Sequence, residues 1–318
     1  MNDPVVSSLL PVVLLIAAGF LAGKRRWVGA GADAVKDLSN LIFLLLAPAL
    51  LFRAMSTVYV EQLQFKPVAV YFIASGLLFA GTLALRGFNR TAALLALANT
   101  YSNTVMIGIA LIGLAYGEAG MVVLLTLISL HSLVLLTSAT VVLELAVAPE
   151  HAVHNAEERR SMGHVVLRAL RNAVIHPVPL PIMAGLLWAQ TGFTMPEAID
   201  KPIALLGQAF TPVALVMVGL TLAFTPVGQH WRGALTQALV KNLLHPLLVV
   251  VVGLALGVNG LPLTVMVVAA SLPIGANVFL FSQRYKTAEA LVTASVVVST
   301  VLALGTLTLV MMAVRWLG

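Results

Sequence analysis

The chain has 318 residues, of which 60% are hydrophobic and only 9% are charged, and it contains no cysteine. Soluble domains carry roughly a quarter charged residues, so a water-soluble fold is excluded and lipid is the expected solvent for most of the chain. The lack of cysteine in the sequence excludes disulfides, thiolate nucleophiles and sulfur-ligated metal centres. The net charge of +6 comes from Lys and Arg residues in short gaps between apolar runs, which excludes the basic face expected of a nucleic-acid-binding protein.

Ten apolar runs are predicted to cross a membrane, because each is close to the roughly 20 residues that span the hydrocarbon core. The first is followed, rather than preceded, by Lys24, Arg25 and Arg26, whereas a cleaved signal peptide begins with its basic residues. We therefore expect a retained span whose N-terminus lies outside the cytoplasm. The expected spans are residues 5–23, 37–55, 67–86, 91–115, 119–147, 172–191, 202–224, 233–257, 261–283 and 288–315.

The Lys and Arg residues predict how these spans are oriented. Most of the 18 fall in alternate connections on one side, and the other side holds only Arg53, Lys66, Lys201 and Arg315. Because short cytoplasmic connections are enriched in Lys and Arg, the rich side is expected to be cytoplasmic. Both termini are then expected to be non-cytoplasmic.

The one long polar connection, residues 148–171, divides the chain into two halves of five spans each. The two halves therefore enter the membrane from opposite sides, as in an inverted repeat. Pro48 in the second span and Pro212 in the seventh lie in similar apolar surroundings, which supports the repeat. The expected division is a first five-helix repeat at 1–147, a cytoplasmic loop at 148–171 and a second five-helix repeat at 172–318.

Two of the spans carry matching polar interruptions. The fourth contains Asn99, Thr100, Ser102, Asn103 and Thr104 within six residues, and the ninth contains Pro273, Gly275 and Asn277. Polar side chains are costly in hydrocarbon unless they face protein or water, and proline removes a backbone donor while glycine relaxes the backbone. Corresponding interruptions in two halves indicate a transporter's binding site, where the Asn amides and half-helix N-termini would bind an anion.

Lys241 and His245 are ionisable residues inside the eighth span. A lysine at that depth is expected to face an aqueous cavity, a cluster of carbonyls or an anionic substrate, with snorkelling to the surface as the alternative. His245, one turn further on, is a candidate proton carrier, and the alternative is a hydrogen-bonded packing residue. We assign both to charge balance or coupling.

None of the 12 acidic residues falls at the middle of a span, which favours an anion over a cation as the substrate. Sodium could still be held by carbonyls and hydroxyls, so sodium coupling stays open. The sequence has no glycine-rich nucleotide loop and no acidic cluster that would hold magnesium. No nucleophile, base and acid lie together at membrane depth, so we expect that the protein is not an enzyme. We also expect it to hold no cofactor and no metal.

Several segments together resemble the auxin efflux carrier family, which includes plant auxin carriers and bacterial permeases for malonate or malate. The segments that carry the resemblance are 43–52, 102–111 with the following Tyr116 and Gly117, 241–246, and 271–285. The chain departs from the family at Ala110, where the family often has a proline after Gly-Ile. The break in the fourth helix is then expected to depend on Gly108 and the Asn/Thr/Ser cluster.

The resemblance implies an all-α integral membrane protein of ten transmembrane helices in two inverted five-helix repeats, in a bacterial inner membrane. Helices 1, 2, 6 and 7 would form a scaffold, and helices 3–5 and 8–10 a transport domain whose broken helices 4 and 9 cross at the substrate site. An elevator-type movement of the transport domain would give alternating access. The predicted substrate-binding residues are Asn99, Ser102, Asn103, Thr104, Gly108, Pro273, Gly275 and Asn277.

The leading hypothesis is a secondary active or facilitative transporter of a small organic anion, a carboxylate such as malonate, malate or an auxin-like acid. Its expected partners are the substrate and the lipid bilayer, and a homodimer is compatible with it. One alternative is a sodium-coupled organic-anion symporter that resembles the bile-acid carriers. Another, from a different class, is a membrane sensor that contacts a cytoplasmic partner through the 148–171 loop.

Overall fold

The computed structural model describes residues 4–27, 32–151, 179–225 and 228–316, and their regular elements are all helices. Two of the predicted features lie partly outside this range, namely the 148–171 loop beyond His151 and the start of the span at 172–191. The helices are α1 (Pro4–Lys24), α2 (Ala32–Leu41), α3 (Ala47–Met55), α4 (Phe65–Arg86), α5 (Arg90–Thr100), α6 (Ile109–His151), α8 (Pro179–Gln190), α9 (Glu197–Phe224), α10 (Trp231–Leu239), α11 (His245–Ala255), α12 (Gly260–Ser271), α13 (Asn277–Arg284) and α14 (Glu289–Ala313). Short 3₁₀ turns lie at Val60–Gln62, Gly228–His230 and Val314–Trp316.

Three widened π-helical turns lie within the helical rods, where two join one helix to the next and one begins a helix. They are η1 (Ile42–Leu46) between α2 and α3, η3 (Thr104–Gly108) before α6, and η6 (Val240–Leu244) between α10 and α11. Pro48 follows the first and Pro246 the third, each in the first turn of the next helix. Because proline has no N–H and its ring displaces the carbonyl one turn earlier, the backbone widens at these two points without ending the rod.

Six continuous helical stretches within the described residues are long and apolar enough to cross a bilayer. They are Val35–Met55, Phe65–Arg86, Thr104–Ala146, Glu197–Phe224, Gly228–Ala255 and Glu289–Ala313. The stretch from Thr104 is 43 residues long and bends at Gly117, whose φ of 58° lies outside the helical region. Shorter apolar helices lie at Leu9–Lys24, Leu180–Gln190 and Gly260–Ser271, and large side chains such as Leu14, Leu85 and Leu205 are exposed, as expected of a protein embedded in lipid.

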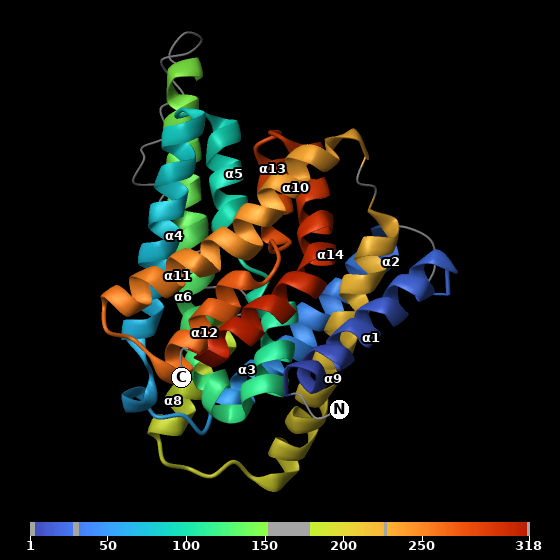
Figure 1. The fold of residues 1–318 in the computed structure, drawn as a ribbon. Helices are drawn as coiled ribbons and strands as arrows, with labels where there is room; N and C mark the ends of the chain where they lie inside the picture. Colours follow the sequence, from blue (N-terminus) through green and yellow to red (C-terminus); the bar gives the residue numbers. More distant parts are fainter. Residues whose placement is uncertain (1–3, 28–31, 152–178, 226–227, 317–318) are drawn as a thin grey trace.

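The connections between helices alternate between two ends of the molecule (Figure 1). Those after α4 and α13 lie toward the top of the view, and those after α3 and α8 lie toward the bottom. Arg86, Arg90, Arg284 and Lys286 flank the upper pair, whereas Arg53 and Lys66 flank the α3–α4 connection. The charge difference expected from the sequence therefore falls on opposite ends of the fold.

One side of the molecule is built from α1, α3, α8 and α9. α1 packs along α9, and α8 packs against α3 (Figure 1). The α1–α9 contact is so close that a Cβ added to Gly19 would overlap the carbonyl oxygen of Val216, and one added to Gly219 would overlap that of Ile16. Small residues allow this backbone-to-backbone approach, which drives helix association in lipid where the hydrophobic effect does not.

Candidate site at the crossing of two broken helices

Both predicted interruptions break their helices. α5 ends at Thr100 and the helix resumes at Thr104, while α12 ends at Ser271 and α13 begins at Asn277. Leu272 is extended, with ψ of 150°, because the residue before a proline is disfavoured in the helical region. In the other break the side chain of Asn103 accepts a hydrogen bond from the backbone N–H of Met106 at 3.3 Å, which caps the new helix start. Ala110 lies within α6, so the break at 101–103 needs no proline there.

The two unwound segments pair with each other like a short antiparallel ladder. The N–H of Asn103 donates to the carbonyl of Pro273 at 2.9 Å, and the N–H of Gly275 donates to the carbonyl of Tyr101 at 3.0 Å. These bonds place Ser102 opposite Ile274. Unpaired backbone N–H and C=O groups are very costly away from water. The pairing removes this cost, because each unwound segment bonds to backbone groups of the other that have no partner within their own helix.

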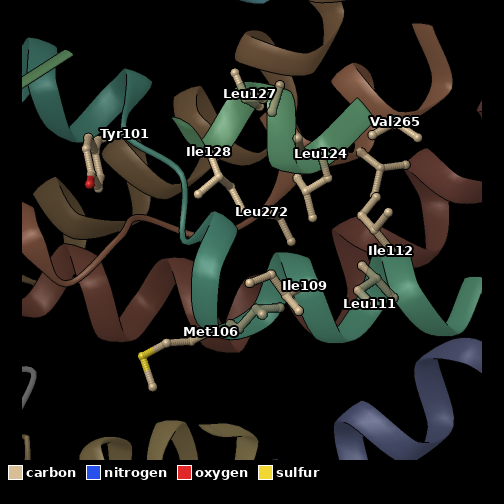
Figure 2. Close-up of a cluster of buried hydrophobic side chains, with 14 of the residues drawn as sticks. Tyr101, Met106, Ile109, Leu111, Ile112, Leu124, Leu127, Ile128, Val265 and Leu272 are labelled. Atoms are coloured by element: carbon tan, nitrogen blue, oxygen red, sulfur yellow. The ribbon is translucent and has the colours of Figure 1, made fainter. Parts of the chain in front are cut away.

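Close packing holds this pairing in one position. A Cβ on Gly275 would lie 2.7 Å from Cδ1 of Tyr101 and 3.1 Å from the carbonyl oxygen of Ser102, so only glycine allows the two segments to approach. Leu272 points into an apolar cluster with Ile109 and residues of the following part of α6, as Figure 2 shows. Gly108 makes room for Leu272, since a Cβ there would lie 2.8 Å from its Cδ1.

A buried group of polar side chains surrounds Tyr71 of α4. Its hydroxyl lies 2.9 Å from Oγ of Ser102, 3.1 Å from Nε2 of His131 and 3.3 Å from the carbonyl of Thr100. Tyr71, Ser102 and His131 are all almost fully buried. These contacts hold the first break against α4 and α6.

Tyr101 connects the two breaks through its side chain. Its hydroxyl lies 2.7 Å from Oγ of Ser132 and accepts a hydrogen bond of 2.7 Å from the amide nitrogen of Asn277. The predicted residue Asn277 therefore uses one of its two amide N–H donors within the protein, at the start of α13.

Lys241 lies at the end of α12, on the same side of the crossing as Tyr71, whose ring centre is 5.2 Å from that of His245. It is fully buried, and its Nζ donates to the carbonyls of Ala270 and Leu272, the latter at 2.7 Å. Of the surroundings that the sequence allowed, the structure therefore shows the carbonyl cluster. His245 is also fully buried, and its Nε2 lies 2.9 Å from Oγ of Ser75.

A small cavity of about 130 Å³ lies against the crossing. Asn103 and Met106 line it from the start of one second half-helix, and Ala276 and Phe279 line it from the start of the other. Met106 points away from the apolar cluster in Figure 2, in agreement with this position. The remaining lining residues come from α9, its C-terminal end and α14: Met217, Val218, Thr221, Leu222, Thr225, Thr293, Val296, Val297 and Thr300.

The electrostatic character of this cavity favours an anion. Two helix N-termini face it, and a helix N-terminus carries partial positive charge. Several of their first N–H groups are already bonded within the protein, among them those of Met106 and Phe279. Since Oδ1 of Asn103 caps the N–H of Met106, its amide NH₂ is left as a donor, and the structure gives it no partner among the described residues. None of the described lining residues is acidic.

A larger cavity of about 980 Å³ opens on the opposite side, between α3, α6, α8 and α9. Arg53 and Asp200 lie in its wall and form an exposed two-point salt bridge, with N–O distances of 2.8 and 3.1 Å. Gln208 and Thr211 of α9 also line it. None of the predicted substrate-binding residues is among the described residues that line this larger cavity.

The predicted site residues thus separate into two groups. Asn103 faces the small cavity directly, and Pro273, Gly275, Asn277, Thr104 and Gly108 build the backbone of the crossing next to it. Ser102 points toward Tyr71, and Asn99 donates to Oγ1 of Thr82 at 3.1 Å, so these two side chains hold the site from behind. Lys241 and His245 are also behind the crossing.

Three residues that support the crossing were not among the predicted site residues: Tyr71, Tyr101 and His131. His131 is an ionisable residue inside an apolar run, a signal that alone would have marked it. The threonines that line the small cavity carried no such signal, because isolated threonines are common in transmembrane helices and bond to their own backbone.

A helical membrane protein with two broken helices that cross beside a cavity has the architecture of a membrane transporter. The comparisons with known proteins agree. Residues 4–311 match the model of the family described as membrane transport protein, and the chain belongs to that family, which includes the auxin efflux carriers. It is a family of transporters rather than enzymes.

Three relatives show how far the similarity extends. A Rhizobium meliloti (strain 1021) protein named "Putative malonate transporter" is 29% identical over 319 residues, which cover 96% of this chain and 95% of that protein. Uncharacterized transporter YfdV of Escherichia coli (strain K12) is 25% identical over 305 residues, or 92% of each chain. Auxin efflux carrier component 8 of Arabidopsis thaliana is 24% identical over 241 residues, which cover 64% of this chain and 66% of that protein. The resemblance to the auxin efflux carrier family is thereby confirmed, and an integral membrane protein with a small-molecule substrate follows from it.

Proposed function

We propose that the protein transports a small organic anion with one or two carboxylates, such as malonate or malate, and binds it in the small cavity at the crossing. The observation that carries this proposal is the set of groups that face the cavity: the amide of Asn103, the N-termini of two half-helices and no acidic side chain among the described lining residues. The positive dipole end of a helix and a side-chain amide donor both attract a carboxylate. A relative named as a malonate transporter supports this substrate class.

The position of the two cavities supports an elevator-type mechanism. The cavity of about 980 Å³ lies between α6 and the side built from α3, α8 and α9, and the cavity of about 130 Å³ lies between α9 and the crossing. Both therefore lie along the boundary between the α1, α3, α8 and α9 side and the part that carries the broken helices. A shift of the crossing along α9 would expose Asn103 first to one face and then to the other.

We also propose the ten-span inverted repeat, with the loop at 148–171 between its halves. In that division α1 and α3 belong to the first two spans, and α8 and α9 to the sixth and seventh. The first span packs on the seventh, and the sixth packs on the second. A two-fold relation between the halves exchanges the first span with the sixth and the second with the seventh. A contact between the first and seventh spans therefore implies a contact between the sixth and second spans. The charge distribution supports termini outside the cytoplasm of a bacterial inner membrane, and a homodimer is compatible with this arrangement.

Uptake into proteoliposomes tests the proposed function. The purified protein is expected to catalyse uptake of labelled malonate or malate, and excess unlabelled carboxylate on the inside is expected to accelerate it by exchange. Empty liposomes provide the background, and indole-3-acetate tests whether a bulkier monocarboxylate is accepted. Folded protein that moves none of these three acids in either direction would contradict the proposal.

A further inference from the structure

The break in the ninth span leaves the C-terminal end of α12 inside the protein. A helix C-terminus presents carbonyls without intrahelical partners and carries partial negative charge. In transporters with broken helices, such ends and the unwound carbonyls next to them are the groups that bind a coupling cation. The end of α12 would therefore be a cation site if nothing else occupied it.

A side chain of the chain itself occupies this end. Nζ of Lys241 donates to the carbonyls of Ala270 and Leu272, one in the last turn of α12 and one just beyond it. Lys241 has no exposed surface, and none of the ion pairs among the described residues involves it. An ammonium has three donors and no acceptor, so acceptors such as carbonyls are its natural partners.

The backbone of the eighth span places Lys241 there. The residue lies in the π-helical turn η6, directly before His245 and Pro246, and α12 packs against both η6 and α11. The widened turn rotates the residues within it relative to a regular helix, and π-turns of this kind are frequent at functional sites. Asn242, the next residue, is fully buried too and donates to the carbonyl of Ser299 at 2.9 Å, so both polar residues of the turn are committed to the crossing region.

The end of α5, the corresponding half-helix of the other break, is held differently. The carbonyl of Thr100 accepts from the neutral hydroxyl of Tyr71 at 3.3 Å, and Oγ1 of Thr100 bonds to the carbonyl of Ala96. The two breaks therefore differ in charge: α12 ends on a lysine, whereas α5 ends on hydroxyl groups.

We propose that Lys241 is a built-in counter-cation, which occupies the place at the end of α12 where a coupling sodium ion would otherwise bind, so that the protein transports its anion independently of sodium. This inference rests on the proposed function for its transport part, and its cation-site part stands on the geometry of Lys241 alone. Lys241 is here a positioning residue that fixes the break, and it does not line the small cavity.

Two variants of Lys241 separate a cation site from simple packing. Lys241→Ala removes the charge and leaves space for a cation between the carbonyls, whereas Lys241→Met removes the charge but fills the space. Propylammonium, which matches the atoms lost in Lys241→Ala, and Na⁺ are the probes. The first readout is the melting temperature of the detergent-purified protein, which needs no substrate and no transport activity.

We expect propylammonium or Na⁺ to raise the melting temperature of Lys241→Ala by about 4 °C or more over choline, and to leave the wild type and Lys241→Met unchanged. In proteoliposomes the wild type is expected to transport equally well in Na⁺ and in choline, whereas Lys241→Ala is expected to lose about tenfold in flux and to recover part of it with the same probes.

Several outcomes overturn the proposal. The first is that the wild type loses most of its flux, or several degrees of melting temperature, when choline replaces Na⁺. The second is that neither probe changes the melting temperature of Lys241→Ala. The third is that the probes raise the melting temperature of Lys241→Met as much as that of Lys241→Ala. If Lys241→Ala does not fold, the response of the wild type to Na⁺ decides alone. Failure of every carboxylate to be transported would refute the proposed function, while the melting temperatures would still decide the cation site.

Discussion

Replacing Gly275 by alanine should separate the two unwound segments of the crossing. The new Cβ would lie 2.7 Å from Cδ1 of Tyr101, whereas carbon atoms in contact are about 3.5–4.0 Å apart, so roughly 1 Å of movement is needed. The ring cannot swing aside freely, because its hydroxyl is held at 2.7 Å by both Ser132 and Asn277. Overpacking costs about 1–3 kcal/mol and each weakened hydrogen bond about 1 kcal/mol, less roughly 0.5 kcal/mol for a stiffer unfolded chain.

We therefore expect Gly275→Ala to lose about 2.5–4.5 kcal/mol of stability, which for a chain of this length corresponds to a melting temperature lower by about 4–7 °C. The displaced break also moves Asn103, so carboxylate flux in proteoliposomes should fall by about tenfold or more. Gly305→Ala is the matched control, since nothing lies within 4 Å of a Cβ at that position inside α14 and alanine is the better helix former. The melting temperature and flux of Gly108→Ala should lie between those of Gly275→Ala and Gly305→Ala. The reason is that the new Cβ would meet only the end of the flexible Leu272 side chain. If Gly275→Ala is as stable and as active as Gly305→Ala, the close approach of the two breaks is not a requirement.

Three further substitutions probe other parts of the molecule. Asn103→Asp keeps the cap on the new helix start but replaces the donor toward the cavity by a negative charge. Carboxylate flux should therefore fall by about a hundredfold, with little change in melting temperature. A flux equal to that of the wild type would refute the anion site. Tyr101→Phe removes the hydroxyl that accepts from the Asn277 amide and should cost about 1–2 kcal/mol in thermal unfolding, and an unchanged melting temperature would show that this bond contributes nothing. Arg53→Ala and Asp200→Ala each break an exposed salt bridge. A double-mutant cycle of melting temperatures should therefore show a coupling of no more than about 2 °C. A larger coupling would mean that the salt bridge holds α3 to α9.

The sequence predicted the features that follow from cost in lipid. Asn103, Pro273 and Gly275 stood out because polar groups and helix-breaking residues are expensive in an apolar run, and both breaks occur where they lie. The absence of acids from the middle of the spans likewise predicted a cavity without carboxylates among its described lining residues.

The sequence could not tell which way each polar side chain points. Asn99 and Asn103 lie four positions apart in one polar run, yet Asn99 bonds to Thr82 behind the crossing and Asn103 faces the cavity. The extended residues between them change the direction of the chain, and helical spacing no longer applies. The partner of Lys241 was open for a similar reason, because the carbonyls that it binds become available only through a break about 30 positions further along the chain.

The pairing of the two breaks also has a consequence for biogenesis. Tyr101 and its partner Asn277 are 176 positions apart. The carbonyl of Tyr101 and the N–H of Asn103 likewise bond only to Gly275 and Pro273, so they have no permanent partner until almost the whole chain has been synthesised. Long-range contacts of this kind form late, because the loop must close before the contact rewards it. The nascent first half would have to keep this gap hydrated or shielded inside the membrane. A chain terminated before the second break should therefore be degraded, while two half-chains made together in one cell could complete each other.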